Sequence, residues 1–291
     1  MGLIVEAIIT GILTGGVYAL MASGLTLVFG VMEIINIGQG ALVILGAYLS
    51  YFLEQNLHID LFLGLLITMP LMFLLGILIE FFFIRPIKRD RTMLSILVTF
   101  GIALIIEGVL NWAFTADYVK LQAWYSTASF PIGGFYISYI YVFGFLLAVV
   151  LLAGLYLLLY RTKFGQSIRA AMQNRTAAQL IGIDVGRVST LTFGIGVALA
   201  AAGGVAFGAT NAFDAGSGYD LISRLLAIII FGGMGSLSGA LIASVSMLVI
   251  EDVTSVVWSP VWATTVFFIL LVLILLIRPQ GLFGQAEGRK Q

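Results

Sequence analysis

The sequence contains few residues that could carry out covalent chemistry. It has no cysteine and a single histidine, His58, in a polar connection between two apolar runs. A lone histidine in such a connection is usually solvated and seldom a ligand. No histidine cluster, serine–histidine–aspartate set or pair of acids at helical spacing is present. We therefore predict no catalytic residue, no metal site and no cofactor, and an intramembrane enzyme is the least favoured interpretation.

Two acidic residues inside long apolar runs could bind or carry an ion. Glu80 lies five residues before Arg85, so local charge compensation explains it more simply than proton transfer does. Glu107 has no partner that the sequence reveals. A secondary carrier needs a coupling-ion site within the membrane, and two isolated acids do not make a convincing one. A stand-alone carrier or channel is the alternative from another functional class.

Neutral polar residues and glycines interrupt the apolar runs twice, in GVMEIINIGQG (30–40) and in FGGMGSLSG (231–239). Polar groups at membrane depth cost free energy unless they face protein or a watery cavity, and glycine-interrupted helices are typical of transporter binding sites. The candidates for a substrate pathway are Asn36, Gly38, Gln39, Gly40, Gly233, Gly235 and Ser236. The alternative is that Asn36 and Gln39 hydrogen-bond neighbouring helices, while the glycines allow close helix packing.

The elements that position these residues are membrane helices. The 291-residue chain is 61% apolar and only 10% charged, whereas soluble domains average about 25% charged residues. Apolar runs of about 20 residues, the length that crosses a bilayer, recur along the chain. They lack the alternation of barrel strands, so helices are the expected structure. We predict an all-α, polytopic membrane protein with one domain over residues 1–291.

Hydrophobic length predicts about seven crossing helices. They cover residues 5–30, 34–53, 61–84, 93–113, 139–160, 188–211 and 258–277. A further apolar segment, 223–250, is divided by the glycines of 231–239 into pieces of about ten residues, each about 15 Å of helix. That length is half of the roughly 30 Å hydrocarbon layer. We therefore expect a re-entrant pair of half-helices that begins and ends on one side of the membrane.

Basic residues give the expected orientation. Twelve of the 14 lysines and arginines lie in three segments, after the third, fifth and last of the crossing helices. The positive-inside rule places these segments in the cytoplasm. The N-terminus is then outside, the C-terminus is cytoplasmic, and residues 161–187 form a cytoplasmic segment.

The cytoplasmic segment 161–187 is too ordered for a flexible linker. Its stretch QSIRAAMQ repeats apolar residues at helical spacing. Thr176 and Gln179 fit a capping box that would start a second short helix, and Gly182 is placed to end it. We expect these two helices to serve as a docking element for a cytoplasmic subunit. The alternative is an amphipathic element held on anionic lipid.

Long stretches of the chain resemble one transporter family. The resemblance is to the permeases of branched-chain amino acid ABC transporters, the LivH type. It is carried, in fixed order along almost the whole chain, by GLTLVFGVMEIINIGQGALVILGAYLS, IEFFFIRPIKRDRTMLSILVTFGIALI, GQSIRAAMQNRTAAQLIGIDVGRVSTLTFGIGVALAAAGGVAFG, FGGMGSLSGALIASV and the tail IRPQGLFG. This resemblance implies the type II ABC importer permease fold. It also implies that residues 161–187 hold coupling helices, which insert into a cleft of an ATPase subunit.

Individual positions carry over from this resemblance. The coupling residues that match the family pattern are Gly165, Arg169, Ala170, Asn174, Ala178, Gly182 and Ile183. One departure is NIGQG (36–40), where many relatives read Asn-Phe-Ala-His-Gly. Permeases for amides and urea share the family, so this departure keeps an amide or urea permease as the alternative.

The energy source is expected to lie in other chains. No G-x-x-x-x-G-K-[ST] phosphate loop occurs in the sequence, so ATP cannot be bound by that route. We therefore expect a non-catalytic permease subunit. The resemblance implies a homologous second permease, two cytoplasmic ATPase subunits docked on 161–187 and an extracytoplasmic substrate-binding protein, with membrane lipid around them and no nucleic acid. The expected function is import of branched-chain amino acids across the cytoplasmic (inner) membrane.

Overall fold

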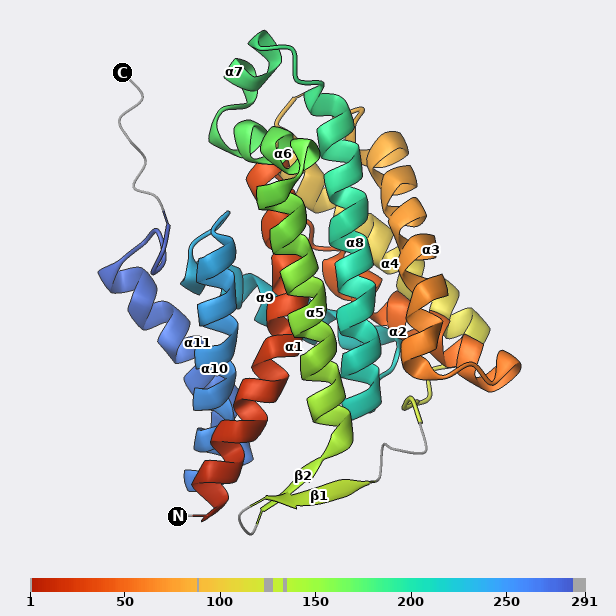
Figure 1. The fold of residues 1–291 in the computed structure, drawn as a ribbon, viewed down its shortest axis with the longest axis vertical. Coiled ribbons are helices and arrows are strands. Elements are labelled where there is room, and N and C mark those ends of the chain that lie inside the picture. Colours follow the sequence, from red (N-terminus) through yellow and green to blue (C-terminus); the bar gives the residue numbers. More distant parts are fainter. Residues whose placement is uncertain (1, 88, 123–127, 133–134, 285–291) are drawn as a thin grey trace.

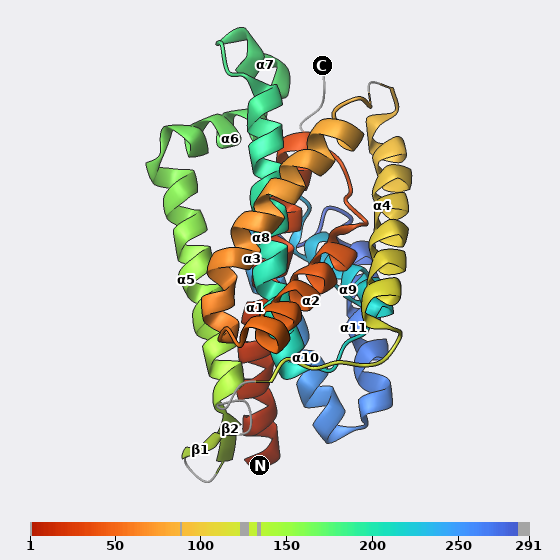
Figure 2. The same cartoon turned by 90° about the vertical axis from the view of Figure 1, so that its right-hand side faces the viewer.

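The structure is a computed structural model that describes residues 2–87, 89–122, 128–132 and 135–284. It is an elongated bundle of helices, with the start of α1 and a β hairpin at one end and α6 and α7 at the other (Figures 1 and 2). Among the described residues, eight helices are long and apolar enough to cross a membrane. The prediction of an all-α polytopic membrane protein is confirmed.

The elements follow the chain in a simple order. The first half contains α1 (Gly2–Met32), α2 (Gln39–Leu57), α3 (Leu61–Ile79), the π-helix η1 (Glu80–Ile84) and α4 (Arg91–Phe114). The hairpin of β1 (Ser129–Ile132) and β2 (Phe135–Ser138) is antiparallel, with Ser129 opposite Ser138. The second half contains α5 (Tyr139–Arg161), α6 (Lys163–Gln173), α7 (Arg175–Leu180), α8 (Val185–Thr210), the 3-10 helix η2 (Ala215–Ser217), α9 (Gly218–Gly232), α10 (Leu237–Val257) and α11 (Pro260–Ile277).

Helices α1 and α8 form the centre of the bundle. Most of their residues are buried; α1 packs against α10 and α8, and α8 also packs against α2 and α3. A Cβ added to Gly11 would lie 2.6 Å from the Cα of Val249, and one added to Gly24 would lie 2.5 Å from the carbonyl oxygen of Gly196. Small residues at such interfaces let membrane helices approach closely. The glycine- and alanine-rich sequences of α1 and α8 therefore specify the core.

The predicted basic segments gather at one end of the bundle. The connection between η1 and α4 lies at the same end as α6 and α7 (Figure 2). Residues 278–284 follow α11, and the N–H groups of Leu282 and Phe283 hydrogen-bond to the C-terminal end of α9. Lys88, Arg289 and Lys290 lie outside the described residues. This clustering agrees with the topology that the positive-inside rule predicts.

The second predicted span, 34–53, starts later than expected. Helix α2 begins at Gln39, and residues 33–38 connect it to α1 without forming an α-helix. Helix α2 is not among the eight helices that meet the length and hydropathy criteria for crossing a membrane. The apolar residues of 34–37 suggested a continuous span, but their burial comes from contact with neighbouring helices: Ile34 is fully buried in the core.

The second interruption separates two helices, as predicted, but both are longer than half-spans. Helix α9 has 15 residues and α10 has 21, about 22 and 31 Å of helix. Their turn, at 233–236, lies beside Gly30 near the end of α1, and the segments 215–232 and 237–257 are both candidate membrane spans by length and composition. The predicted segment ended at residue 250, before Glu251, whereas α10 continues to Val257. Arg224 of α9 donates two hydrogen bonds, of 2.6 and 2.7 Å, to the carboxylate of Glu251 on α10, and this pairing keeps both charges within the helices.

Candidate functional site

The first interruption holds two buried amides. The side chains of Asn36 and Gln39 belong to residues that are 1% and 0% exposed. Asn36 Nδ2 donates to Gln39 Oε1 at 3.0 Å, and Gln39 Nε2 donates to the carbonyl oxygen of Gly196 on α8 at 3.2 Å. Within this chain the two amides thus join the start of α2 to α8. This arrangement is the alternative that the sequence left open, in which the amides hydrogen-bond neighbouring helices.

The glycines of the same interruption bring three helices into backbone contact. The backbone N–H of Ile37 donates to Thr99 Oγ1 of α4 at 3.1 Å, and a Cβ on Gly38 would lie 2.9 Å from the carbonyl oxygen of Thr99. A Cβ on Gly40 would overlap the carbonyl oxygen of Gly218, the first residue of α9. The start of α2 is therefore held between α4 and α9.

A small pocket beside this contact contains an acid that the sequence left without a partner. The hydroxyl of Tyr219, on α9, donates to Glu107 Oε2, on α4, at 2.6 Å. Ile37 and Ala41 line the same pocket. Residues 107 and 219 are far apart in the sequence, so no local pattern could have paired them. The pocket lies next to the predicted pathway residues, although those residues do not themselves face it.

The second interruption is a tight turn sealed by the chain's own tail. Gly233 and Gly235 have φ of 101° and 82°, a left-handed conformation that favours glycine. Ser236 Oγ accepts from the N–H of Gly239 and caps α10. The N–H groups of Leu282 and Phe283 donate to the last carbonyl oxygens of α9, at 2.9 and 3.0 Å. The tail therefore satisfies carbonyls that the end of a helix leaves unpaired.

Residues 161–187 form two short helices, α6 and α7, as predicted. Thr162 caps α6 by accepting from the N–H of Gly165 at 3.0 Å. Asn174 Oδ1 accepts from the N–H of Ala177 at 2.9 Å, so Asn174 is the N-cap of α7. The predicted capping box at Thr176 and Gln179 is wrong by two residues. Threonine and asparagine can both act as N-caps. Asn174 is the cap because its backbone is extended and lies between the end of α6 and the start of α7.

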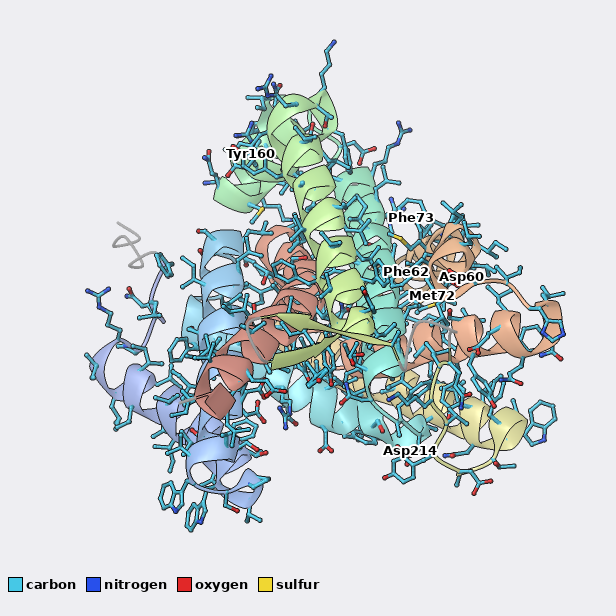
Figure 3. All side chains as sticks on the ribbon, turned by 60° about the horizontal axis from the view of Figure 1, so that its bottom comes forward. Asp60, Phe62, Met72, Phe73, Tyr160 and Asp214 are labelled. Carbon is cyan, nitrogen blue, oxygen red and sulfur yellow. The ribbon has the colours of Figure 1, made fainter. Side chains whose placement is uncertain are left out.

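Packing fixes α6 on the end of α5. A Cβ on Gly165 would overlap the carbonyl oxygens of Leu158 and Leu159, so only glycine allows this approach. The Arg169 guanidinium stacks on the ring of Tyr160 at 4.6 Å, and Tyr160 lies beside α6 (Figure 3). Ala170 is half-buried. These contacts hold α6 in one position relative to the membrane helices.

Helix α7 projects from the bundle and exposes apolar side chains. Ala178 is buried and Ile183 is half-buried, whereas Leu180 and Ile181 are 84% and 75% exposed. Gly182 follows them with φ of 86°. Figure 1 shows α7 at the extremity of the molecule. Leu180, the last residue of α7, and Ile181, its C-cap, are thus adjacent exposed apolar side chains at the tip of the molecule.

The structure brings segment 161–187 and the second interruption together. A groove of about 540 Å³ is lined by Arg169 and Met172 from α6, by Gly235 and Ser236 from the turn, and by Phe283 from the tail. A neighbouring groove of about 440 Å³ shares Arg169 and the turn. The sequence assigned Gly235 and Ser236 to a substrate pathway and Arg169 to coupling. In the fold these residues border one space.

Glu80 does not use the partner that the sequence suggested. It is 1% exposed and accepts a 2.5 Å hydrogen bond from the hydroxyl of Thr190 on α8. Arg85 instead lies over the ring of Phe81, at 5.5 Å from its centre. The π-helix η1 begins at Glu80 and adds a residue to the turn, which changes the spacing that an α-helix would give to Glu80 and Arg85.

Gly182 provides a test of backbone geometry in the cytoplasmic segment. A Cβ at this position would meet no atom within 4 Å, so a substitution there acts only through its φ of 86°. We expect Gly182→Val to destabilise the turn between α7 and α8 by about 1–2 kcal/mol, because branched residues disfavour this conformation. Gly182→Asn should cost less, since asparagine adopts it more readily. Amide hydrogen exchange over 175–187 measures this difference; equal protection in both variants would contradict it.

Comparison with known proteins assigns the chain to a family. The model of the family described as "Branched-chain amino acid transport system / permease component" matches residues 7–275. The chain is 26% identical to the branched-chain amino acid permease BraD of Pseudomonas aeruginosa, over 98% of this chain and 97% of that protein. It is 27% identical to LivH of Escherichia coli K12, with the same coverage.

Two further relatives also align over most of the chain. A probable LivH of Methanocaldococcus jannaschii is 29% identical over 94% of this chain and 90% of that protein. The LivM permease of Salmonella typhimurium is 24% identical over 94% of this chain and 72% of that protein. No solved structure matches the chain. Because the family model covers nearly all of the helices that build the bundle, this chain belongs to the branched-chain amino acid transport permease family.

Proposed function

We propose that this chain is the membrane-spanning permease subunit of an ABC importer for branched-chain amino acids in the cytoplasmic membrane. The observation that carries the proposal is the family match over residues 7–275, in a chain that lacks a phosphate loop. ATP hydrolysis then takes place in separate subunits. The matching permeases named for these amino acids favour this substrate over amides or urea.

In this proposal α6 and α7 receive the ATPase subunits. Leu180 and Ile181 supply the apolar surface that enters the ATPase cleft, and Ala178 and Ile183 anchor α7 beneath them. Asn174 and Gly182 set the ends of α7 through its cap and its left-handed turn. The segment 161–187 is accordingly cytoplasmic, and the N-terminus lies outside.

Movement of α6 passes to the membrane helices along two contacts. Gly165 places α6 directly against the end of α5, and Arg169 extends to Tyr160 and to the groove at the turn of 233–236. This turn joins α9 and α10, so a shift of α6 alters the position of both helices. Gly235 and Ser236 therefore act in coupling as well as at the inner end of the pathway.

A second permease of the same family completes the pathway. The match to a LivM protein supports a homologous partner, and a binding protein delivers the amino acid from outside. Membrane lipid covers the remaining apolar surface of the outer helices, where α11 exposes Val272, Leu276 and Ile277. The buried amides Asn36 and Gln39 keep the start of α2 in place beside that pathway.

Reconstitution in liposomes tests the proposed function. We expect ATP-dependent uptake of leucine, isoleucine or valine when this chain is combined with its second permease, two ATPase subunits and the loaded binding protein. The chain alone should take up none of these amino acids. The complete transporter supplied with a non-hydrolysable ATP analogue should also show no uptake. Uptake by the chain alone would identify a secondary carrier or channel. Uptake of urea or acetamide without any branched-chain amino acid would identify the alternative substrate class.

A further inference from the structure

Helix α9 carries an exposed polar face at membrane depth. Tyr219 is 38% exposed, and Asp220 and Ser223 are also exposed, whereas Leu221 and Leu225 on the opposite side are buried in the bundle. All five residues lie within Ala215–Gly232, the segment of η2 and α9 that is long and apolar enough to span a membrane. Polar side chains do not face lipid when protein or water is available to cover them. This face of α9 is therefore directed at a partner chain or at a water-filled path.

Glu107 of α4 points at this face and lacks a cationic partner. Its Oε2 accepts a hydrogen bond of 2.6 Å from the hydroxyl of Tyr219. In the part of the chain that the structure describes, the ion pairs are Arg187–Asp184 and Arg224–Glu251, and neither includes Glu107. A carboxylate within a membrane helix is rare and costly unless a cation or several donors compensate it. One tyrosine hydroxyl leaves the other carboxylate lone pairs available for a further donor.

The space next to Glu107 has the size of an ammonium group. The pocket has a volume of about 10 Å³, room for one water molecule or one –NH₃⁺. Its remaining wall is apolar and formed by Ile37, Ala41, Ala103 and Ile222, with the backbone of Gly218 at its edge. The pocket is too small for a whole amino acid, so a larger molecule could insert only its charged end there. An aliphatic side chain would then lie along the apolar wall.

We propose that Glu107, oriented by Tyr219, receives the α-ammonium group of the transported amino acid on the path between the two permeases. This inference rests on the proposed function and names one of its substrate contacts. A single carboxylate in a small pocket gives weak binding, which suits a translocation step because the substrate must leave again. The partner permease supplies the opposite wall, since the pocket of this chain holds only the ammonium end.

The test uses the complete reconstituted transporter and the variant Glu107→Gln. Glutamine keeps an oxygen that accepts from Tyr219 but loses the charge, so the contact between α4 and α9 is retained. We expect leucine uptake to fall at least about tenfold, while ATP hydrolysis stimulated by loaded binding protein stays within about twofold of the wild type. The number of leucine molecules carried per ATP then falls. Unchanged uptake in Glu107→Gln would overturn the subsite.

Two companion variants separate charge from structure. Tyr219→Phe retains the carboxylate and removes only its hydroxyl partner, so we expect a smaller loss of uptake, about two- to fivefold. Glu54→Gln is the control: this acid lies on α2 and accepts from the backbone N–H of Gln122, away from the pocket, and uptake should be unchanged. A loss in Tyr219→Phe that equals or exceeds that in Glu107→Gln would assign the pair a structural role and overturn the proposal.

A measurement on the wild-type transporter does not depend on the folding of any variant. A hydrophobic carbodiimide should modify Glu107, and leucine-loaded binding protein with ATP should slow that modification; modification at an unchanged rate would overturn the subsite. The outcomes also distinguish the two proposals. If the wild type takes up leucine and Glu107→Gln takes it up equally well, only the proposal of the subsite is contradicted. If the wild type carries no branched-chain amino acid, the proposed function is contradicted, and so is the subsite that rests on it.

Discussion

Replacing Gly40 by alanine should destabilise the folded bundle by at least about 3 kcal/mol, because the new methyl group has no space. Its Cβ would overlap the carbonyl oxygen of Gly218 and lie 3.0 Å from the Cβ of Ile222. The obstacle is backbone, which cannot rotate away as a side chain can. The starts of α2 and α9 would have to separate, and the hydrogen bonds of Asn36 and Gln39 depend on the position of α2.

Thermal unfolding of the purified chain in detergent measures this effect. A matched control is Gly154→Ala in α5, where a Cβ would meet no atom within 4 Å. Alanine is the better helix former by up to about 1 kcal/mol, so this control should be neutral or slightly stabilising. A Gly40→Ala chain that remains monodisperse and unfolds at the temperature of the control would show that α2 and α9 do not meet as described.

Replacing Leu180 and Ile181 together by serine should weaken ATPase binding at least about 100-fold and abolish ATP-dependent uptake. Each buried aliphatic side chain contributes about 1.5–3 kcal/mol at an interface, and about 1.4 kcal/mol corresponds to a tenfold change in affinity. Both side chains are more than two-thirds exposed in the isolated chain, so their loss should leave its own stability within about 0.5 kcal/mol.

Co-purification with the ATPase subunits, followed by titration of the affinity, checks this expectation. The control is Arg187→Ser, whose side chain is 85% exposed at the start of α8 but does not belong to α7. It should retain ATPase binding within about threefold. Normal recovery of the ATPase subunits with the double serine variant would show that α7 does not form the docking surface. It would favour the alternative that α7 binds anionic lipid.

Several parts of the fold could be predicted because their causes are local. Caps, glycine positions and apolar spacing act over a few residues, so the two helices of 161–187 and the interruption at 231–239 were predicted correctly. The same local signals placed the cap of α7 at Thr176 when the structure uses Asn174. Hydropathy also ended the predicted segment 223–250 before Glu251, because Arg224 compensates Glu251 only once α9 and α10 are antiparallel.

The sequence by itself determined the membrane class, the helical structure, the segregation of basic residues and the family pattern, since composition and short-range spacing carry all four. Only the tertiary structure decided which polar groups are satisfied inside the chain and which remain available. The side-chain amides of Asn36 and Gln39 hydrogen-bond within the chain, between α2 and α8, whereas Glu107 keeps carboxylate lone pairs without a donor in a pocket beside Tyr219. The physical reason is that hydrogen-bond partners more than 100 residues apart meet only through helix packing, which no local pattern encodes.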